Sequence, residues 1–305
     1  MNIKFDCAPV LLMVFNRPEE TRLIFNAIKQ VQPSKLYIAS DGPREHIDGE
    51  SEKCNNVKAI FEDINWDCEV KTLFRTKNLG CKYAVSSAID WFFENESMGI
   101  ILEDDTLPNN SFFAFCTQLL HKYENDSRVM RISGYNPLSG KLNLNHDYFY
   151  SYYSFMWGWA TWRRVWNFND VELKLYQQAK LNKIIFQYPF DNDRNKCFED
   201  ALSGLDTWDY QFDFAILSQN GLQIVPTKSL IQNIGFNERA THTFSDNGSG
   251  RAKIVSHELN FPLISPKDFM VPNVEFEKLL IKSSRENFSL KRSLYSLYKF
   301  ILRFK

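Results

Sequence analysis

The sequence predicts an α/β protein with a mostly parallel central sheet flanked by helices, in the Rossmann-like arrangement. Two observations favour this class. In the first third of the chain, apolar runs of strand length alternate with amphipathic stretches of helix length, a pattern typical of parallel sheets. The run from Gly99 to Leu102 contains no polar residue, as expected for a central strand that is covered on both faces.

The expected elements follow one another with clear boundaries. Val10 to Phe15 forms a strand, and Pro18 begins a helix with two glutamates in its first turn that runs to about Gln30. The elements expected next are a strand over Lys35 to Ser40, a helix near Ser51 to Asp63, a strand over Glu69 to Phe74, a helix over Tyr83 to Phe93 and the strand over Gly99 to Leu102.

Composition excludes several classes of protein. The chain has 305 residues, 44% of them hydrophobic, with 36 Lys and Arg against 37 Asp and Glu. This is the profile of a globular protein, and without a basic field or a recognisable motif we expect no nucleic-acid partner. The six cysteines form no CxxC pair, which favours reduced thiols in a cytosol. The apolar run at 9–15 is too short for a membrane span or a signal sequence.

Charged and polar residues follow each of the four expected strands. They are Asn16-Arg17, Asp41-Gly42, the stretch from Arg75 to Gly80, and Glu103-Asp104-Asp105. In open α/β sheets ligands bind beyond the carboxyl ends of the strands, so these residues are expected to form the site. Neither GxGxxG nor GxxxxGK[ST] is present, so a phosphate ligand would have to be held by a metal ion.

The acidic triplet Glu103-Asp104-Asp105 is the most informative motif. Three successive carboxylates repel one another unless a cation or basic side chains lie among them. Mg²⁺ and Mn²⁺ prefer oxygen ligands, and they commonly use one or two protein carboxylates together with substrate phosphates. The alternative is a solvated acidic turn that caps the helix near Asn109.

Together these motifs resemble the nucleotide-sugar-binding half of the GT-A fold glycosyltransferases. Within that class Glu103-Asp104-Asp105 is most similar to the Glu-Asp-Asp variant of the DxD motif in the N-acetylglucosaminyltransferase I branch. The similarity continues, in the same order, at Ile132 to Asn136, Met156 to Trp159, Trp208 to Tyr210, and Gly235 to His242. The resemblance spans about residues 9 to 245 and rests on the number, order and spacing of short motifs.

The resemblance implies roles for the residues that follow the strands. Asp105 is expected to be the one direct protein ligand of a Mn²⁺ (or Mg²⁺), a Lewis acid for the leaving UDP. The residues expected to bind the nucleotide sugar are Phe15, Asn16, Arg17, Asp41, Asn78, Gly80, Glu103, Asp104, Trp159, Arg239 and His242. Arg17 and Asp41 would contact the nucleobase and ribose. Asn78 and Gly80 stand where the animal members have a more basic stretch.

Structural interpretations of the same residues stay open. Asn16-Arg17 can cap a helix, and Asp41-Gly42 can form a turn that is closed by the aspartate side chain. Trp159 can belong to a packed core, because tryptophan carries a large apolar area. Arg239 and His242 can be exposed loop residues.

Sugar transfer with inversion needs a carboxylate that accepts the proton of the acceptor hydroxyl. Asp209 is the expected general base, because it matches the family motif and its aromatic neighbours Trp208 and Tyr210 can partly desolvate it. Asp206 is the alternative, since residues three apart share one helix face. A surface helix with acids in its first turn is the structural interpretation.

The expected domain organisation is a GT-A domain over 1–250, an extension over 251–286 and a tail helix over 287–305. The domain would have a nucleotide-sugar-binding half at 1–135 and an acceptor and catalytic half at 136–250. In the tail, apolar residues gather on one helical face and Lys and Arg on another. Such a helix suits an anionic membrane surface; a dimer contact and docking on the protein's own body are the alternatives.

The resemblance implies a metal-dependent inverting glycosyltransferase, with UDP-N-acetylglucosamine as the first-choice donor and a saccharide or lipid-linked glycan as acceptor. Because no amino-terminal anchor is recognisable, we expect a bacterial-type cytoplasmic enzyme, peripheral on the inner face of the cell membrane, in surface polysaccharide or lipooligosaccharide synthesis. A metal-dependent phosphoesterase and a catalytically silent sugar-binding protein are the alternatives.

Overall fold

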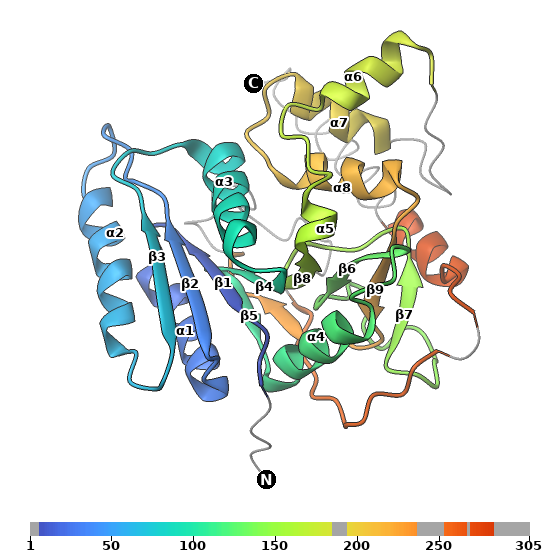
Figure 1. The fold of residues 1–305 in the computed structure, drawn as a ribbon, viewed down its shortest axis with the longest axis horizontal. Coiled ribbons are helices and arrows are strands. Elements are labelled where there is room, and N and C mark those ends of the chain that lie inside the picture. Colours follow the sequence, from blue (N-terminus) through green and yellow to red (C-terminus); the bar gives the residue numbers. More distant parts are fainter. Residues whose placement is uncertain (1–5, 185–193, 237–252, 267–268, 284–305) are drawn as a thin grey trace, which may run out of the picture.

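The computed structural model describes residues 6–184, 194–236, 253–266 and 269–283. Its centre is an eight-stranded sheet in the order β3-β2-β1-β4-β8-β6-β9-β7 (Figure 1). β2 pairs in parallel with β1 and β3, β1 with β4, and β6 with β9, whereas β8 and β7 pair antiparallel with their neighbours. The predicted fold class, a mostly parallel central sheet flanked by helices, is confirmed.

Every element predicted in the first third of the chain is present. The elements are β1 (Val10–Val14), α1 (Pro18–Val31), β2 (Lys35–Ser40), α2 (Glu50–Ala59) continued by the 3-10 turn η1 (Ile60–Asp63), β3 (Glu69–Phe74), α3 (Gly80–Asn95) and β4 (Met98–Glu103). Helix α3 begins at Gly80 rather than at Tyr83. Gly80 has a φ of +76°, a conformation that favours glycine, and the next two backbone N–H groups are capped by a carboxylate from far along the chain.

The rest of the chain completes the sheet and covers its carboxyl edge. Its elements are β5 (Thr106–Pro108), α4 (Asn110–Lys122), β6 (Val129–Ser133), β7 (Tyr148–Ser151), β8 (Trp159–Trp162), α5 (Arg163–Trp166), α6 (Lys174–Leu181), α7 (Arg194–Leu202), α8 (Asp209–Ser218), β9 (Leu222–Pro226) and β10 (Ile231–Asn233). β5 and β10 form a small antiparallel sheet. Helices α6, α7 and α8 gather together at the upper right in Figure 1.

The strand order creates a switch point between β1 and β4. The chain passes from β1 to β2 and then to β3 in one direction. It then returns across β2 and β1 to β4. Because such crossovers are right-handed, α1 and α3 cover opposite faces of the sheet. The loops after β1 and β4 therefore leave the sheet side by side at its carboxyl edge, where open α/β sheets bind ligands.

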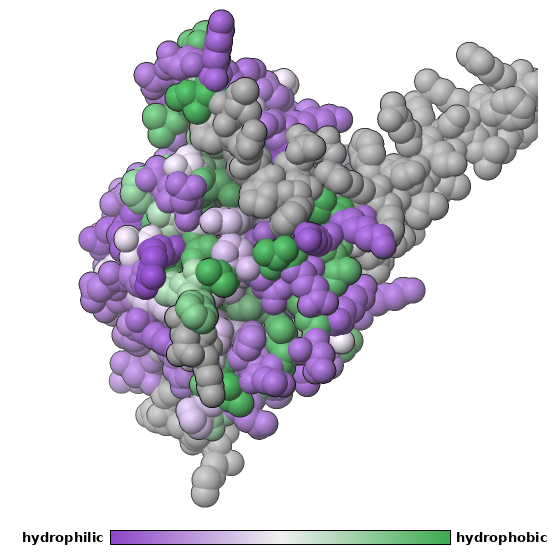
Figure 2. All heavy atoms as spheres, turned by 90° about the vertical axis from the view of Figure 1, so that its right-hand side faces the viewer, coloured by the Kyte–Doolittle hydropathy of each residue, from purple (hydrophilic) through white to green (hydrophobic). Residues whose placement is uncertain are grey.

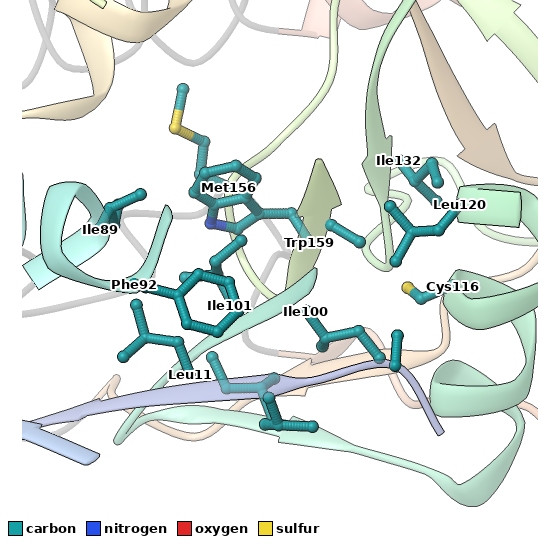
Figure 3. Close-up of a cluster of buried hydrophobic side chains, with 14 of the residues drawn as sticks. Leu11, Ile89, Phe92, Ile100, Ile101, Cys116, Leu120, Ile132, Met156 and Trp159 are labelled. Atoms are coloured by element: carbon teal, nitrogen blue, oxygen red, sulfur yellow. The ribbon is translucent and has the colours of Figure 1, made fainter. Parts of the chain in front are cut away.

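The core lies between the sheet and the helices on its two faces. Figure 3 shows side chains of the central strands meeting those of α3 and α4; it labels Leu11, Ile100, Ile101, Ile132, Ile89, Phe92, Cys116 and Leu120. All of these residues are 0% exposed. This packing fixes the strands whose carboxyl ends carry the polar residues, because close-packed interiors deform little.

The extension after residue 252 packs on β7 at the edge of the sheet. A helix over 274–283 buries Phe276, whose ring centroid lies 4.8 Å from that of Phe149. The buried carboxylate of Glu277 accepts hydrogen bonds from Ser151 Oγ at 2.9 Å and from the backbone N–H of Tyr152 at 2.7 Å. Figure 2 shows hydrophobic residues dispersed among hydrophilic ones on this side of the molecule. The predicted tail helix over 287–305 lies outside the described residues.

Within the described ranges, no helix combines the length and the apolar character needed to cross a membrane.

Candidate active site

The loops after β1 and β4 are joined by a buried ion-pair cluster. Asp104 accepts hydrogen bonds from the backbone N–H of Phe15 at 3.2 Å and from Arg17 Nη1 at 3.2 Å. The same nitrogen of Arg17 donates to Asp105 Oδ2 at 2.8 Å. Arg17 is 8% exposed, so one buried guanidinium lies between two carboxylates of the triplet. The structure thus brings together Phe15, Arg17 and the acidic motif.

The cluster has more carboxylates than Arg17 can neutralise. Burial raises the pKa of Asp104 to about 7, although Arg17 opposes this shift. Burial also raises the pKa of Glu103 well above its usual range, and the nearby carboxylates, Asp105 first, raise it further. Burial alone would lower the pKa of Arg17, but Asp104 and Asp105 outweigh it and the pKa is raised. A further cation would stabilise the ionised form of these carboxylates.

Two carboxylates of the triplet have oxygens that no hydrogen-bond donor reaches among the described residues. Among the described residues, no donor reaches the Glu103 carboxylate, whose residue is fixed instead through backbone bonds to Thr106 Oγ1. Arg17 is the side-chain partner of Asp105, and it touches one of the two oxygens. The Asp105 side chain is 22% exposed. Both groups can therefore meet a ligand at the edge of the sheet.

The carboxylates of this site can hold a metal ion only through a single protein ligand. Within the part of the chain that the structure describes, no group of three or more His, Cys, Asp and Glu side chains is arranged to hold a metal. Mg²⁺ and Mn²⁺ can, however, be held by a single carboxylate when phosphate oxygens and waters complete the coordination shell. Asp105, one oxygen of which has no hydrogen-bond partner among the described residues, fits this mode.

Glu50 organises the residues beside Phe15. This carboxylate is 1% exposed and accepts hydrogen bonds from Asn16 Nδ2 at 2.8 Å and from the backbone N–H of Arg44 at 2.7 Å. The Arg44 guanidinium also pairs with Glu50 and lies 5.6 Å from the Phe15 ring centroid. Arg44 and Glu50 were not predicted from the sequence, because an acid in the first turn of a helix is common and gives no signal of a site.

Asp41, Asn78 and Gly80 join the loops after β2 and β3. The Asp41 carboxylate accepts hydrogen bonds from the backbone N–H groups of Gly42 at 2.9 Å and Leu79 at 3.0 Å. Asn78 Nδ2 donates to the Gly42 carbonyl at 2.8 Å, and Asn78 Oδ1 accepts from the Gly80 N–H at 3.2 Å. Burial raises the pKa of Asp41, against the effect of these backbone donors. The three residues shape the rim of the site through contacts with the protein itself.

Asp209 opens helix α8 with one carboxylate oxygen available. Its Oδ1 accepts hydrogen bonds from Thr207 Oγ1 and, at 3.0 Å, from the backbone N–H of Tyr210. In the described ranges no donor reaches Oδ2. Burial raises the pKa of Asp209, Thr207 opposes the shift and Asp213 adds to it. The carboxylate is close enough to Glu103 to raise the pKa of that residue too.

Asp206, the alternative base, caps helix α3. Its two oxygens accept hydrogen bonds from the backbone N–H groups of Cys81 at 2.9 Å and Lys82 at 2.7 Å. Both oxygens are therefore occupied by a helix N-terminus. The geometry favours Asp209, which lies three residues later with a free oxygen.

Trp159 is a core residue in the structure, which corrects the expectation that it faces a sugar. It is 0% exposed. Its ring stacks on Trp208 at 5.7 Å with an interplanar angle of 21°, and it packs against Phe212 at 5.3 Å. Figure 3 shows Trp159 close to Met156 within the hydrophobic cluster. With no exposed face left for a sugar ring, Trp159 supports the start of α8 through Trp208.

Strand β10 brings Gly235 against Asp105. The backbone N–H of Ile234 donates to the Asp105 carbonyl at 2.8 Å, and a Cβ on Gly235 would lie 2.4 Å from Asp105 Oδ2. Glycine is therefore required for this close approach. The segment Gly235 to His242, which is part of the family resemblance, thus starts beside the predicted metal ligand. Arg239 and His242 lie outside the described residues.

Comparison with known proteins gives structural similarity alone. No protein-family model matches the chain, and no curated protein matches it. Among solved structures, it is similar to apo-UDP-glucose pyrophosphorylase (9% identity, 74% of this chain and 93% of that one, TM-score 0.38). It is also similar to HddC from Yersinia pseudotuberculosis (8% identity, 52% and 78%, TM-score 0.32). A third is 4-diphosphocytidyl-2C-methyl-D-erythritol synthase from Anaerococcus prevotii (6% identity, 63% and 84%, TM-score 0.32).

Proposed function

We propose that this chain is a metal-dependent inverting glycosyltransferase that uses a UDP-sugar, with UDP-N-acetylglucosamine as the first donor to test. The acceptor would be a saccharide or a lipid-linked glycan. The proposal is carried by one arrangement: the Arg17, Asp104 and Asp105 cluster lies at the switch point of the sheet, and Glu103 links it electrostatically to Asp209 with its free oxygen. Donor binding and proton acceptance are the two functions that sugar transfer needs.

The donor half of the site would bind the nucleotide sugar through residues of the loops after β1, β2 and β4. Asp105 would hold Mn²⁺ or Mg²⁺ together with the diphosphate, and the metal, when bound, stabilises the charge of the leaving UDP. Phe15 and Arg44 flank the position proposed for the nucleobase. Glu103, whose carboxylate has no donor in the described structure, would accept hydrogen bonds from hydroxyl groups of the donor.

Asp209 would act as the general base. Its Oδ2 would accept the proton of the acceptor hydroxyl while the hydroxyl oxygen attacks the anomeric carbon and the bond to UDP breaks. The raised pKa of Asp209 supports this role, because a carboxylate of higher pKa is a stronger base toward the hydroxyl proton. Thr207 and the Tyr210 N–H hold the other oxygen and orient the group.

The experiment is an acceptor-dependent UDP-release assay on the wild type, Asp209→Asn and the matched variant Asp206→Asn. A panel of saccharide acceptors is offered with UDP-N-acetylglucosamine and Mn²⁺. We expect kcat to fall about 100-fold or more in Asp209→Asn, with an unchanged Kd for the donor, and to stay within a few-fold in Asp206→Asn. Full activity of Asp209→Asn would overturn the assignment of the base.

The same assay separates the two alternative functions. A metal-dependent phosphoesterase would release nucleotide or phosphate at full rate without any acceptor. A sugar-binding protein would bind a glycan and show no turnover with any donor. Either result would contradict the transferase proposal.

A further inference from the structure

Trp157 is the one tryptophan of the aromatic run at 148–166 that reaches the surface. Trp159, Trp162 and Trp166 of the same run are buried, at 0, 1 and 4% exposure, whereas Trp157 is partly exposed. Among the described residues, no acceptor takes a hydrogen bond from its indole N–H. An aromatic side chain with an exposed surface and an unused donor suits a ligand that has both apolar and polar groups.

The start of β8 places Trp157 at the carboxyl end of β4. The two strands are antiparallel, with Trp159 opposite Ile101, and β4 ends at Glu103. Because Trp157 precedes Trp159 by two residues, it lies near the level of Glu103, the first residue of the acidic triplet. Gly158, between the two tryptophans, has a φ of +62°, and a Cβ there would collide with a side chain of β10. Glycine is therefore needed at the turn that presents Trp157.

A second link runs from Trp157 through Phe236 to Asp105. The ring centroids of Trp157 and Phe236 lie 5.6 Å apart, with an interplanar angle of 82°. Phe236 directly follows Gly235, where a Cβ would collide with Asp105 Oδ2. One ring in contact with Trp157 is therefore a single residue away from the backbone that touches the predicted metal ligand. Trp157 thus borders the acidic triplet at both of its ends.

No aromatic ring of the described residues stacks flat on Trp157. Tyr135 and Phe236 meet it at interplanar angles of 62° and 82°, and Phe155 meets it at 46°. The buried Trp159, by contrast, is stacked on a second indole at 21°. A pyranose ring presents C–H groups on its flat faces, and these are attracted to the electron-rich face of an aromatic ring as the positive edge of another aromatic ring is. The exposed part of Trp157 can take such a ring.

We propose that Trp157 is a donor-binding residue: the transferred sugar stacks on its indole, beside Phe236, and an oxygen of the sugar accepts a hydrogen bond from Nε1. The inference rests on the proposed function, because a diphosphate held at Asp105 would bring the attached sugar next to the triplet. It identifies the ligand of this position as the pyranose of a nucleotide sugar. Trp157 then has the role that was predicted for Trp159.

The test compares the binding of UDP and of UDP-N-acetylglucosamine, each with Mg²⁺, to the wild type, Trp157→Ala and Trp157→Phe by isothermal titration calorimetry. We expect Trp157→Ala to raise the Kd of the UDP-sugar at least about tenfold, since it loses both the stacking and the hydrogen bond. The Kd of UDP should not change, because UDP has no sugar at this position. Trp157→Phe keeps an aromatic face and loses only the N–H, so a rise of about threefold is expected.

The matched control is Trp66→Ala, which should leave both Kd values unchanged. Trp66 is also partly exposed, but its indole N–H donates to the Pro33 carbonyl at 2.9 Å, just before β2 begins, so it lies at the amino edge of the sheet. If Trp157→Ala does not fold, saturation-transfer NMR of the wild type with Mg²⁺ decides. Irradiation of the aromatic protons is expected to saturate the sugar ring protons of UDP-N-acetylglucosamine, and a missing transfer would overturn the inference.

The two ligands separate failure of this inference from failure of the proposed function. If UDP binds and Trp157→Ala weakens neither ligand, or weakens both equally, the stacking role of Trp157 is wrong and the proposed donor site stands. If no UDP compound binds, the methyl glycoside of N-acetylglucosamine is the next probe. Its binding to the wild type and not to Trp157→Ala would support the stacking role and contradict the transferase proposal, and no binding would contradict both.

Discussion

Two charged clusters at the carboxyl side of the sheet have opposite composition. Between β1 and β4, the carboxylates of Glu103, Asp104 and Asp105 share the single guanidinium of Arg17. Between β6 and α8, two guanidinium groups share the single carboxylate of Asp213. The first cluster therefore contains more carboxylates than arginines, whereas in the second the carboxylate is bridged by arginines on both oxygens.

Exposure decides what can balance the charges of each cluster. In the first cluster the Asp105 side chain is 22% exposed, so a metal ion with its nucleotide can reach it from solvent. In the second, Arg131 is 0% exposed, so its charge must be balanced within the protein, and Asp213 supplies a carboxylate at 2.7 Å. Because uncompensated buried charge is expensive, the excess of carboxylates in the first cluster indicates that a cation completes it.

The largest effect on stability is expected from Asp213→Asn. This change leaves two guanidinium groups without their carboxylate, and arginine cannot shed its proton to escape the cost. We expect the free energy of unfolding to fall by about 3–5 kcal/mol in urea titrations. The matched control is Asp126→Asn, which breaks a surface pair with Arg128 and should cost less than about 1 kcal/mol. Equal losses in the two variants would contradict this comparison.

Arg17→Met should destabilise the protein by about 3 kcal/mol at pH 8, and by clearly less at pH 5. The difference arises because carboxylates, unlike arginines, can become neutral. The pKa of Asp104 is about 7 even beside Arg17, and loss of Arg17 would raise it further. Urea unfolding of the wild type and Arg17→Met at both pH values measures this loss of stability. A loss that is independent of pH would show that the two clusters respond alike.

A smaller effect is expected in the wild type itself. The folded-state pKa of Asp104, about 7, lies above the ordinary aspartate value of 3.8, so the folded state binds the proton more tightly than the unfolded chain. The contribution of Asp104 to stability is therefore complete below about pH 4 and is lost as the pH rises toward 7. Asp104→Asn should remove this slope, which is at most about 1.4 kcal/mol per pH unit. An unchanged slope in Asp104→Asn would contradict the assignment.

The smallest effect is expected from Asp206→Ala, which removes the cap of α3. We expect a loss of about 1 kcal/mol in thermal or urea unfolding, because Cys81 and Lys82 lose the acceptor for their N–H groups. Asp206→Asn keeps an acceptor oxygen and should lose less. Both variants should retain their transfer rate, which would separate the structural role of Asp206 from the catalytic role proposed for Asp209.

The sequence alone was sufficient for the first half of the sheet. Apolar runs such as Val10–Val14 and the stretch from Gly99 to Leu102 are buried on both faces, so their burial could be predicted directly from residue type. The residues that follow these strands were predictable as a group for the same reason, since parallel strands bring their carboxyl ends together. Strands β6 to β10 had no comparable alternation with helices, and a family resemblance guided their interpretation.

The pairing of the site residues could not be predicted in the same way. Arg131 was not identified from the sequence, because its partner Asp213 lies 82 positions away and nothing local connects the two residues. Asp206 and Asp209 were indistinguishable by spacing, and only the contact of Asp206 with the start of α3 separates them. Trp159 was predicted to face a sugar. Aromatic residues occur both at sugar-binding surfaces and in cores, and residue type does not distinguish the two.

The central claim is that the acidic triplet binds a nucleotide sugar through a metal held by Asp105. The most direct test is isothermal titration calorimetry of UDP and UDP-N-acetylglucosamine against the wild type and Asp105→Ala, each with Mn²⁺ and with EDTA, and with Asp126→Ala as a surface control. We predict binding that requires Mn²⁺ and falls at least about tenfold, or about 1.4 kcal/mol, in Asp105→Ala alone. Binding that is unchanged by EDTA or by loss of Asp105, or no binding of any UDP compound, would contradict the account.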